Sequence, residues 1–363
     1  MDIELKRTEN NTKKNFDFVD TIRCISMIGI VFEHASVFYG ISYPGKQDTF
    51  IEVSVMQFFK FGTIAFFLIG GFLINHKFQE YTPGQYLKNR FKNTIKPWLF
   101  WIMIFVLLDF LDRYVAYRKG GDDRIIVDFF GYAWDRIFNT LFFTSYWFIL
   151  NFLICISLLL IFKKHLYSIW FGLILGILTL FYSFNLYYHW IITQHSTAIF
   201  GFVFYLWLGV FMNRYYEKVM LFVKKSTWPP VILLVLATFL FADWEAAYLL
   251  KSGHSDPYNT LRISNILYSL AAFFMLLKIG NIKTLQEKLE PRKTTFGIYL
   301  IHAVVIERVF PLIFMPLHLD PKLYGVWTNT GFSILKFSIA YFVTLGLVKL
   351  ILKTRMRTFV GSN

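Results

Sequence analysis

Apolar runs of about 20 residues recur along this chain from end to end, and no other feature constrains its fold as strongly. Of 363 residues, 56% are apolar and only 17% are charged, whereas a soluble domain carries about 25% charged residues. A large soluble helical protein would keep polar faces between its apolar stripes. Stretches such as 98–108 and 152–162 are apolar nearly all round. The sequence therefore predicts an all-α, polytopic membrane protein.

The apolar runs divide into ten expected transmembrane spans. Helices are the expected form, because backbone in lipid must satisfy its own hydrogen bonds. The expected spans are 18–40, 53–75, 97–112, 139–162, 167–186, 197–213, 229–249, 262–280, 295–315 and 330–352. We expect one membrane domain (18–352) between an N-terminal tail (1–17) and a C-terminal tail (353–363).

Lysine and arginine are distributed unevenly between the connecting segments. With the N-terminus in the cytoplasm, every inward segment is basic and most outward segments are poor in Lys and Arg. The segment 113–138 is the exception, although its basic residues are nearly balanced by acidic ones. This is the positive-inside pattern, so both termini are expected to be cytoplasmic. It also accounts for the net charge of +14 without a nucleic-acid partner.

The first span carries Asp20, Arg23 and His34, and such residues cost about 2.5–3.5 kcal/mol each inside a bilayer. Arg23 and His34 are eleven positions apart, which places them on one helix face, roughly 16 Å apart along the axis. Glu33 points about 100° away from His34. One interpretation is structural: Arg23 snorkels to the interface and His34 bonds to a neighbouring helix. In the other, His34 is a general base or an acyl carrier beyond a basic entrance.

Several short motifs resemble those of the membrane acyltransferase 3 family, in the expected order over nearly the whole chain. The first is the pair Arg23 and His34, separated by ten residues. The others are Asp20-Thr-Ile-Arg23 at the first helix entry, Phe66-Phe-Leu-Ile-Gly70-Gly-Phe-Leu73 in the second span, Tyr146-Trp147-Phe148-Ile-Leu150 at the fourth, and Gly297-Ile-Tyr299-Leu-Ile-His302 in the ninth. Gly70 stands where that family usually has Ser.

This resemblance implies a membrane O-acyltransferase. Its expected donor is a cytoplasmic acyl-CoA, commonly acetyl-CoA, used as a co-substrate with no bound cofactor. The acceptor would be a hydroxyl of an extracytoplasmic or lipid-linked glycan, and the location the bacterial cytoplasmic membrane, among membrane lipid. The resemblance makes His34 the catalytic residue and Arg23 a donor-binding residue, and we expect Asp20 to be a second catalytic residue.

The third helix departs from the family pattern. The family often shows Arg-x-x-Arg there, but this chain has Arg90 followed by Asn93. Arg90 and Lys92 are the expected donor-binding residues, although Lys92 fits a simple membrane anchor equally well, and Lys lacks the bidentate fork of Arg. A Glu often follows the fourth-helix Trp, but here Asn151 is the nearest polar residue after Trp147.

Four further side chains are candidates for binding the acceptor or supporting the site: Trp147, Tyr299, His302 and Glu307. For His302 and Glu307, structural hydrogen bonding is an equally available reading. Cys24 and Cys155 fall inside apolar spans and form no ligand pattern, so no metal is expected.

The main rival function is an exporter of polysaccharide or lipid-linked sugar, and a sensor or structural protein is a third class. A transport site would gather polar residues from several helices. In this sequence the intramembrane charges are expected to concentrate on the first and ninth spans, which favours the enzyme.

Overall fold

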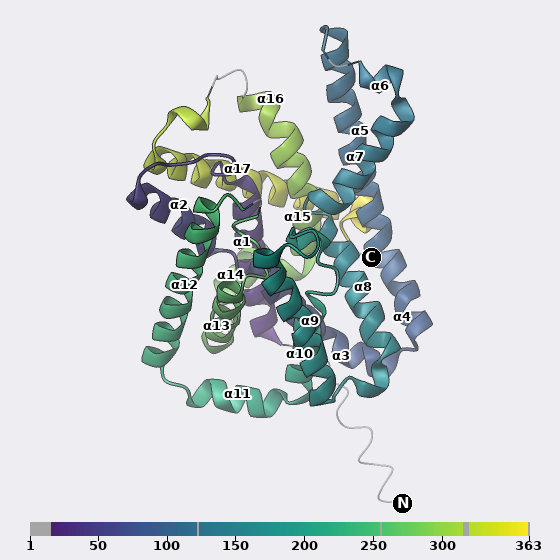
Figure 1. Ribbon diagram of the computed structural model, residues 1–363. Coiled ribbons are helices and arrows are strands. Elements are labelled where there is room, and N and C mark those ends of the chain that lie inside the picture. The colour runs from purple at the N-terminus through teal and green to yellow at the C-terminus, as the bar shows by residue number, and fades with distance from the viewer. Residues whose placement is uncertain (1–15, 122, 255, 315–318, 362–363) are drawn as a thin grey trace, which may run out of the picture.

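The computed structural model describes residues 16–361 apart from 122, 255 and 315–318 (Figure 1). Most of the expected N-terminal tail, 1–15, lies outside the described residues. Helices dominate the described part of the chain, which contains no strand. The longer helices are α1 (Asp17–Ala35), α2 (Lys46–Phe58), α3 (Gly62–Glu80), α4 (Pro83–Arg90), α5 (Lys96–Arg118), α7 (Phe129–Phe143), α8 (Trp147–Ile161), α9 (Ile169–Tyr188), α10 (Val203–Arg214), α11 (Tyr216–Lys225), α12 (Trp228–Lys251), α13 (Ile263–Ile279), α15 (Pro291–Val304) and α17 (Val326–Leu352).

Shorter elements connect these helices. A π-helix, η1 (Phe91–Ile95), joins α4 to α5, and a second, η4 (Val305–Val309), extends α15 into α16 (Phe310–Phe314). The remaining short elements are α6 (Arg124–Val127), α14 (Lys283–Leu289), and the 3₁₀ turns η2 (Lys163–His165), η3 (His195–Thr197), η6 (Pro321–Leu323) and η7 (Arg355–Val360).

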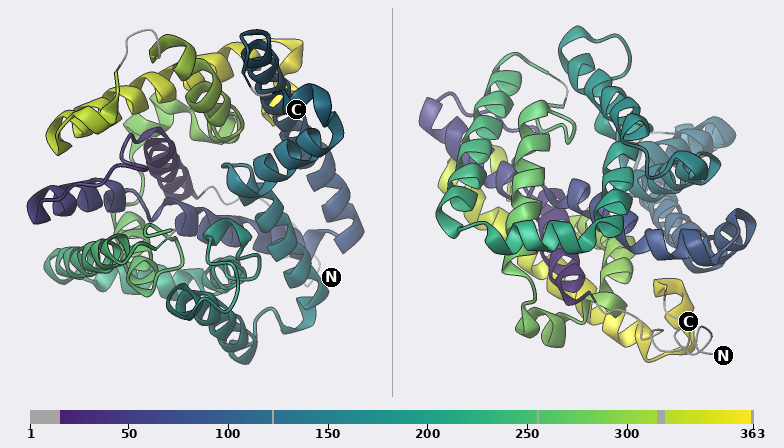
Figure 2. Two further views of the ribbon diagram at one scale, coloured as in Figure 1. Left: turned by 45° about the horizontal axis from the view of Figure 1, so that its top comes forward. Right: turned by 90° about the horizontal axis from the view of Figure 1, so that it is seen from below.

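Helix α1 occupies the interior of the bundle. It packs against α3, α13, α15 and α17, and Figure 2 shows the other helices arranged around it. Phe18, Val19 and Ile22 join a core formed largely with α3, α8 and α10. Met27 and Val31 join a second core with α5, α15 and α17. The charged helix is therefore surrounded by protein, which is where an ionisable membrane residue is tolerated.

Two glycines allow α3 and α10 to pack backbone against backbone. A Cβ atom on Gly71 would lie 1.9 Å from the Leu206 carbonyl oxygen, and one on Gly209 would lie 2.0 Å from that of Leu68. Small residues at such crossings are a common feature of membrane helix pairs. This close packing holds α10 against α3, which in turn packs against α1.

Helices occupy all ten expected spans, but not all qualify as membrane-spanning by length and apolar composition. Six do so alone, and two bent pairs, α7 with α8 and α13 with α14, raise the number to as many as eight. Helix α1 carries four charged side chains and α10 has only 12 residues. The structure therefore supports a multi-pass membrane protein with six to eight candidate spans, and the figure of ten stays a prediction.

The end of the chain packs onto the bundle. Within the expected C-terminal tail, η7 lies against α5: the Trp101 indole donates a hydrogen bond to the Phe359 carbonyl oxygen at 2.9 Å. Val360 is buried against Gly297 of α15. This packing brings Gly361 to the edge of the cavity described next.

Candidate functional site

Three arginines from separate helices converge on one cavity of about 360 Å³. Arg23 comes from α1, Arg90 from the end of α4 and Arg292 from the start of α15. We call this the arginine cavity. Asn93, at the place where a second Arg was expected, also lines it. The expected donor-binding residues Arg23 and Arg90 therefore share a site, to which Arg292 adds a third positive charge.

Asp20 holds two of these arginines in place. Its carboxylate accepts from Arg23 Nη1 at 3.2 Å and from Arg292 Nε at 2.5 Å. Asp17 adds a longer ion pair with Arg292 at 3.7 Å. Asp20 is 14 positions from His34, about 21 Å along the helix. We expected Asp20 to act with His34 as a catalytic residue, but the structure places it beside the arginines.

Lys92 takes no part in the cavity. It lies on the π-helix η1 with an exposed side chain, whereas the neighbouring Asn93 and Thr94 line the cavity. Arg90 is fixed by a hydrogen bond from its Nε to the Tyr86 hydroxyl at 2.8 Å. Of the two expected residues in this segment, only Arg90 faces the space where an anionic ligand could bind.

The wall of the arginine cavity becomes apolar along α1 in the direction of His34. Met27, Ile30, Phe148 and Tyr299 line this part. The Tyr299 hydroxyl donates to the Ser145 carbonyl oxygen at 2.6 Å, and its ring lies 6.0 Å from that of His302. Tyr299 therefore belongs both to the cavity and to the surroundings of the histidines.

His34 and His302 face each other, with ring centroids 5.3 Å apart. His302 is completely buried, and its Nδ1 donates to the Tyr299 carbonyl oxygen at 2.7 Å. Since a neutral imidazole carries one proton, this bond leaves the lone pair on Nε2. That buried Nε2 has no hydrogen-bond partner within the described part of the chain. It is available to accept a hydrogen bond, and the His34 ring lies nearby.

A buried ion pair adjoins His34. Lys60, between α2 and α3, contacts the Glu33 carboxylate, and the Lys60 side chain is only 1% exposed. The Tyr39 hydroxyl is 3.5 Å from the same carboxylate. Glu33 thus points away from His34, as the helix geometry predicts, and pairs with Lys60. Both charges are close enough to act on the His34 imidazole.

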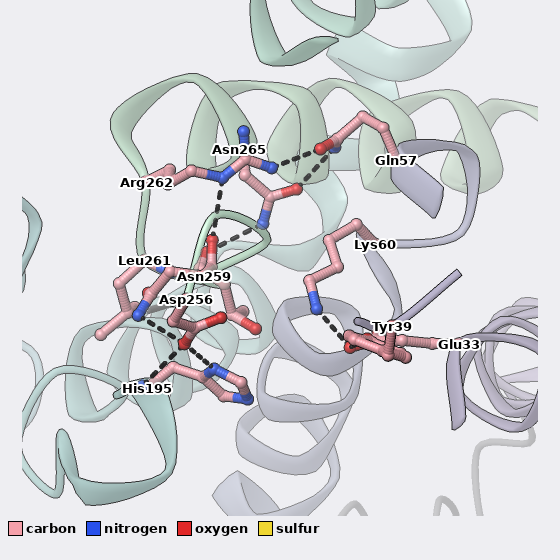
Figure 3. A network of polar contacts seen from close by, with 11 residues as sticks. Glu33, Tyr39, Gln57, Lys60, His195, Asp256, Asn259, Leu261, Arg262 and Asn265 are labelled. Atoms are coloured by element: carbon pink, nitrogen blue, oxygen red, sulfur yellow. Dashed lines mark hydrogen bonds and ion pairs between the residues drawn. The ribbon is translucent and has the colours of Figure 1, made fainter. Parts of the chain in front are cut away.

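A second histidine site lies next to this pair. His195 Nδ1 is 2.7 Å from the Asp256 carboxylate, which also accepts from Asn259 Nδ2 at 3.0 Å (Figure 3). The Trp147 ring meets the His195 imidazole edge-on at 5.4 Å. Burial alone would raise the pKa of the Asp256 carboxyl, but the interactions with His195 and Lys60 outweigh it and hold the pKa at about 2.

These groups form what we call the histidine cluster: His34, His302, His195, Glu33, Lys60 and Asp256. His195 lies within electrostatic range of both Glu33 and His34, and Lys60 lies within that of Asp256. The members come from α1, α15, the α2–α3 junction and two loops. No three His, Cys, Asp or Glu side chains in the described residues are grouped so that they could hold a metal ion.

A network of buried polar side chains fixes the loop that carries Asp256. Arg262, with no exposed surface, donates to the Ala242 carbonyl oxygen at 2.8 Å and to that of Asn259 at 3.2 Å. It also bonds to Gln57 of α2, which in turn donates to Asn265 at 2.8 Å (Figure 3). The loop is therefore tied to α2, α12 and α13.

Buried charges are not concentrated on the first and ninth expected spans. Glu52, Asp243, Glu245 and Arg262 are all buried, on or next to α2, α12 and α13. The expectation from sequence was wrong here because these groups find partners far away in the chain: Glu52 accepts from the Tyr258 hydroxyl at 3.0 Å. A charge satisfied across helices can lie in any span.

Glu307 lies apart from both sites. It is exposed on the π-helix η4, and its neighbouring charges are Arg308, Lys336 and Asp109. Arg308 itself pairs with Asp109 at 2.8 Å. The structure thus joins Trp147, Tyr299 and His302 to the sites and leaves Glu307 on a neighbouring surface.

Four important residues escaped the sequence analysis: Lys60, His195, Asp256 and Arg292. Lys60 gave a usable signal, because it is a lone charge inside an apolar run. Arg292 looked like an ordinary inward-loop cation. His195 and Asp256 stand 61 positions apart in polar loops, and only the fold brings them together.

Comparison with known proteins adds a family to this geometry. The family model of acyltransferase 3, described as an acyltransferase domain, matches residues 16–352. A Staphylococcus aureus protein named "Probable poly-beta-1,6-N-acetyl-D-glucosamine export protein" is 23% identical over 255 residues, covering 69% of this chain and 70% of the relative. A Staphylococcus epidermidis protein of the same name is 26% identical over 169 residues, covering 43% of this chain and 45% of the relative. No solved structure matches the chain.

Proposed function

The chain belongs to the acyltransferase 3 family, and from this premise we propose that it is a membrane O-acyltransferase for a surface glycan. The acyl group, acetyl in the simplest case, comes from a cytoplasmic acyl-CoA. The acceptor is a hydroxyl of an exported or lipid-linked polysaccharide. The protein works as a multi-pass enzyme of the bacterial cytoplasmic membrane, with ten spans and both termini on the cytoplasmic side.

One observation carries this proposal: three arginines share a cavity whose apolar wall follows α1 and reaches Tyr299, next to His302 and His34. The phosphates of CoA are the natural partners of Arg23, Arg90 and Arg292, since guanidinium groups bind phosphate by paired, charge-assisted hydrogen bonds. The pantetheine arm suits the apolar wall. An arm crossing roughly 16 Å along the helix brings the thioester to His34.

His34 is the catalytic residue of the proposal. By one route its imidazole takes the proton of the acceptor hydroxyl while the oxygen attacks the thioester carbonyl and the C–S bond breaks. By the other, the imidazole nitrogen attacks first, the CoA thiolate leaves, and the acyl group passes to the acceptor in a second step. Asp20 serves by fixing Arg23 and Arg292.

The proposed acceptor class is supported by the names of the relatives. Proteins named for export of poly-β-1,6-N-acetyl-D-glucosamine match more than two thirds of this chain, and such a polymer offers free sugar hydroxyls. We propose a surface polysaccharide of this general kind as the acceptor. Trp147, a buried ring at the edge of the histidine cluster, is the proposed wall of the acceptor site.

The rival function, polysaccharide export, has two observations in its favour. The relatives are named as export proteins, and the buried charges are spread over several helices. Cells carrying His34→Ala separate the two functions. If the protein is an acyltransferase, the mutant cells still carry the polymer outside, but the polymer lacks base-labile esters. If the protein is an exporter, the polymer accumulates inside the mutant cells.

The direct test is a single-turnover incubation of the purified protein with radiolabelled acetyl-CoA, beside His34→Ala. Thioester cleavage, or label retained on the protein, in the wild type alone supports the donor and His34 together. Absence of binding and cleavage in a folded wild-type protein overturns the proposed acetyl-CoA donor and favours the exporter.

A further inference from the structure

We propose that His195 is a second catalytic base, held by Asp256, that takes the proton from the acceptor hydroxyl. This inference rests on the proposed acyltransferase function and divides its chemistry between two histidines. His34 handles the acyl group that arrives along α1, and His195 activates the glycan hydroxyl on the other side of the reacting carbon.

The His195–Asp256 pair is built as an acid–base dyad. Asp256 Oδ2 lies 2.7 Å from His195 Nδ1 and 3.3 Å from the His195 backbone nitrogen. Asn259 Nδ2 donates to the same oxygen and to the Thr193 carbonyl oxygen at 2.8 Å. An ionised carboxylate on Nδ1 keeps the proton there, so Nε2 presents its lone pair. The same arrangement orients the histidine of a hydrolase triad.

The second nitrogen of His195 is open to a substrate. Figure 3 shows it pointing away from Asp256, and the described residues provide it with no hydrogen bond. The His195 side chain is 23% exposed, unlike the fully buried His302. A histidine with a purely structural role would normally use both nitrogens or bury the free one against apolar groups.

The dyad borders the path from the donor. Trp147 packs against His195, and the next residue, Phe148, lines the arginine cavity and lies 5.8 Å from Tyr299. The titratable groups within electrostatic range of His195 are Asp256, Glu33 and His34, and Lys60 is paired with Glu33. In this proposal Lys60, paired with Glu33, supplies the positive charge that stabilises the negative charge developing on the carbonyl oxygen during transfer.

The two steps balance as follows. His34 attacks the thioester carbonyl, the C–S bond breaks, and CoA leaves as a thiolate that takes a proton from water. The acceptor hydroxyl then gives its proton to His195 Nε2 as its oxygen bonds to the acyl carbon, and the bonding pair of the C–N bond returns to His34. His195 afterwards releases the proton to solvent. The sum is thioester plus alcohol giving ester plus thiol.

The experiment compares His195→Ala, Asp256→Asn and His34→Ala with a matched control, His189→Asn. His189 is an exposed loop histidine stacked on His254 with a positive φ of 53°, which Asn tolerates. Each folded variant is assayed for single-turnover CoA release from radiolabelled acetyl-CoA. Base-labile esters are then counted on polysaccharide from cells that express the same variant, grown with and without added imidazole.

We expect His195→Ala to release CoA in the first turnover and to retain label, while polysaccharide esters fall by about a hundredfold or more. Imidazole in the medium should restore part of the ester content, because the His195 side chain is partly exposed. Asp256→Asn should lose about tenfold, and His189→Asn should match the wild type.

Normal ester content in His195→Ala would overturn the inference and leave the proposed function intact, provided that His34→Ala is inactive. Loss of CoA release in folded His195→Ala, or no response to imidazole, would also overturn it by giving His195 a donor-side or structural role. If His34→Ala keeps full ester content, the proposed function itself fails.

Discussion

The arginine cavity and the histidine cluster are built in different ways. The cavity takes its charged side chains from three helices, α1, α4 and α15, and these side chains line one space. The cluster takes His34 and His302 from helices, but Lys60, His195 and Asp256 come from a helix junction and from loops. The first is a feature of helix geometry, and the second is a feature of tertiary structure.

This difference suggests that the two regions have different roles, one toward the donor and one toward the acceptor. A donor of fixed structure, such as acyl-CoA, suits a cavity fixed by helices and carboxylates. An acceptor glycan can vary more, and loops are where specificity varies most easily. If this is right, changes in the arginine cavity should alter donor use, while changes in the loops should alter transfer to the acceptor.

The largest expected effect is that of His34→Ala, where the proposed donor and acceptor paths meet. We expect glycan acylation to fall by about a thousandfold or more, since each proposed route passes through this imidazole, either as the base or as the acyl carrier. Membrane insertion should be normal. Base-labile esters on the polysaccharide measure the loss, and His165→Ala, at an exposed histidine in η2, is the control. Full acylation in His34→Ala would remove the central claim.

Lys60→Met tests how much the ion pair between Lys60 and Glu33 contributes to the stability of the protein. The substitution leaves Glu33 as a buried charge without its cation, and breaking such a pair typically costs about 3–5 kcal/mol of stability. The unfolding midpoint of the purified protein in detergent should therefore fall clearly.

The double variant Lys60→Met/Glu33→Gln provides the matched control for this effect. With neither charge present, most of the lost stability should return, while acylation stays low if Lys60 acts on the reacting carbonyl. A single variant as stable as the wild type would show that Glu33 finds another partner or a proton.

Much of the helix-borne region could be predicted from the sequence. The period of 3.6 residues places Arg23 and His34 on one face, and the motif around His302 marks the partner helix. The position of Asp20 could not be predicted in the same way, because its partner Arg292 is 272 positions away. Helix periodicity gives a direction for each side chain but not its neighbour.

The part of the histidine cluster that lies in loops could hardly be predicted from the sequence. Neither His195 nor Asp256 stands in a periodic segment, so spacing carries no information about either. Their meeting depends on the bracing of the 256–262 loop by Arg262, which reaches back to Gln57 on α2. Long-range polar pairs of this kind are invisible to local pattern and appear only once the fold is known.

His302→Gln probes the link between the two regions. The Gln amide offers a donor and an acceptor oxygen, but it has no basic nitrogen and lacks the ring that lies beside His34, so the orientation of His34 is disturbed. We expect kcat to fall by about tenfold with KM for acyl-CoA unchanged, as for loss of an interaction made only in the transition state. A raised KM with normal kcat would instead place His302 with the donor site.

Arg23→Lys should have a smaller effect, confined to the donor side. Lysine keeps the charge but loses the bidentate fork and the fixed bond to Asp20. We therefore expect the apparent KM for acyl-CoA to rise by about three- to tenfold with kcat nearly unchanged. Lys92→Ala is the matched control, because Lys92 is basic and close in sequence to Arg90 but is exposed and does not line the cavity. An unchanged KM in Arg23→Lys, or an equal rise in Lys92→Ala, would mean that general surface charge attracts the donor and that the cavity does not bind it.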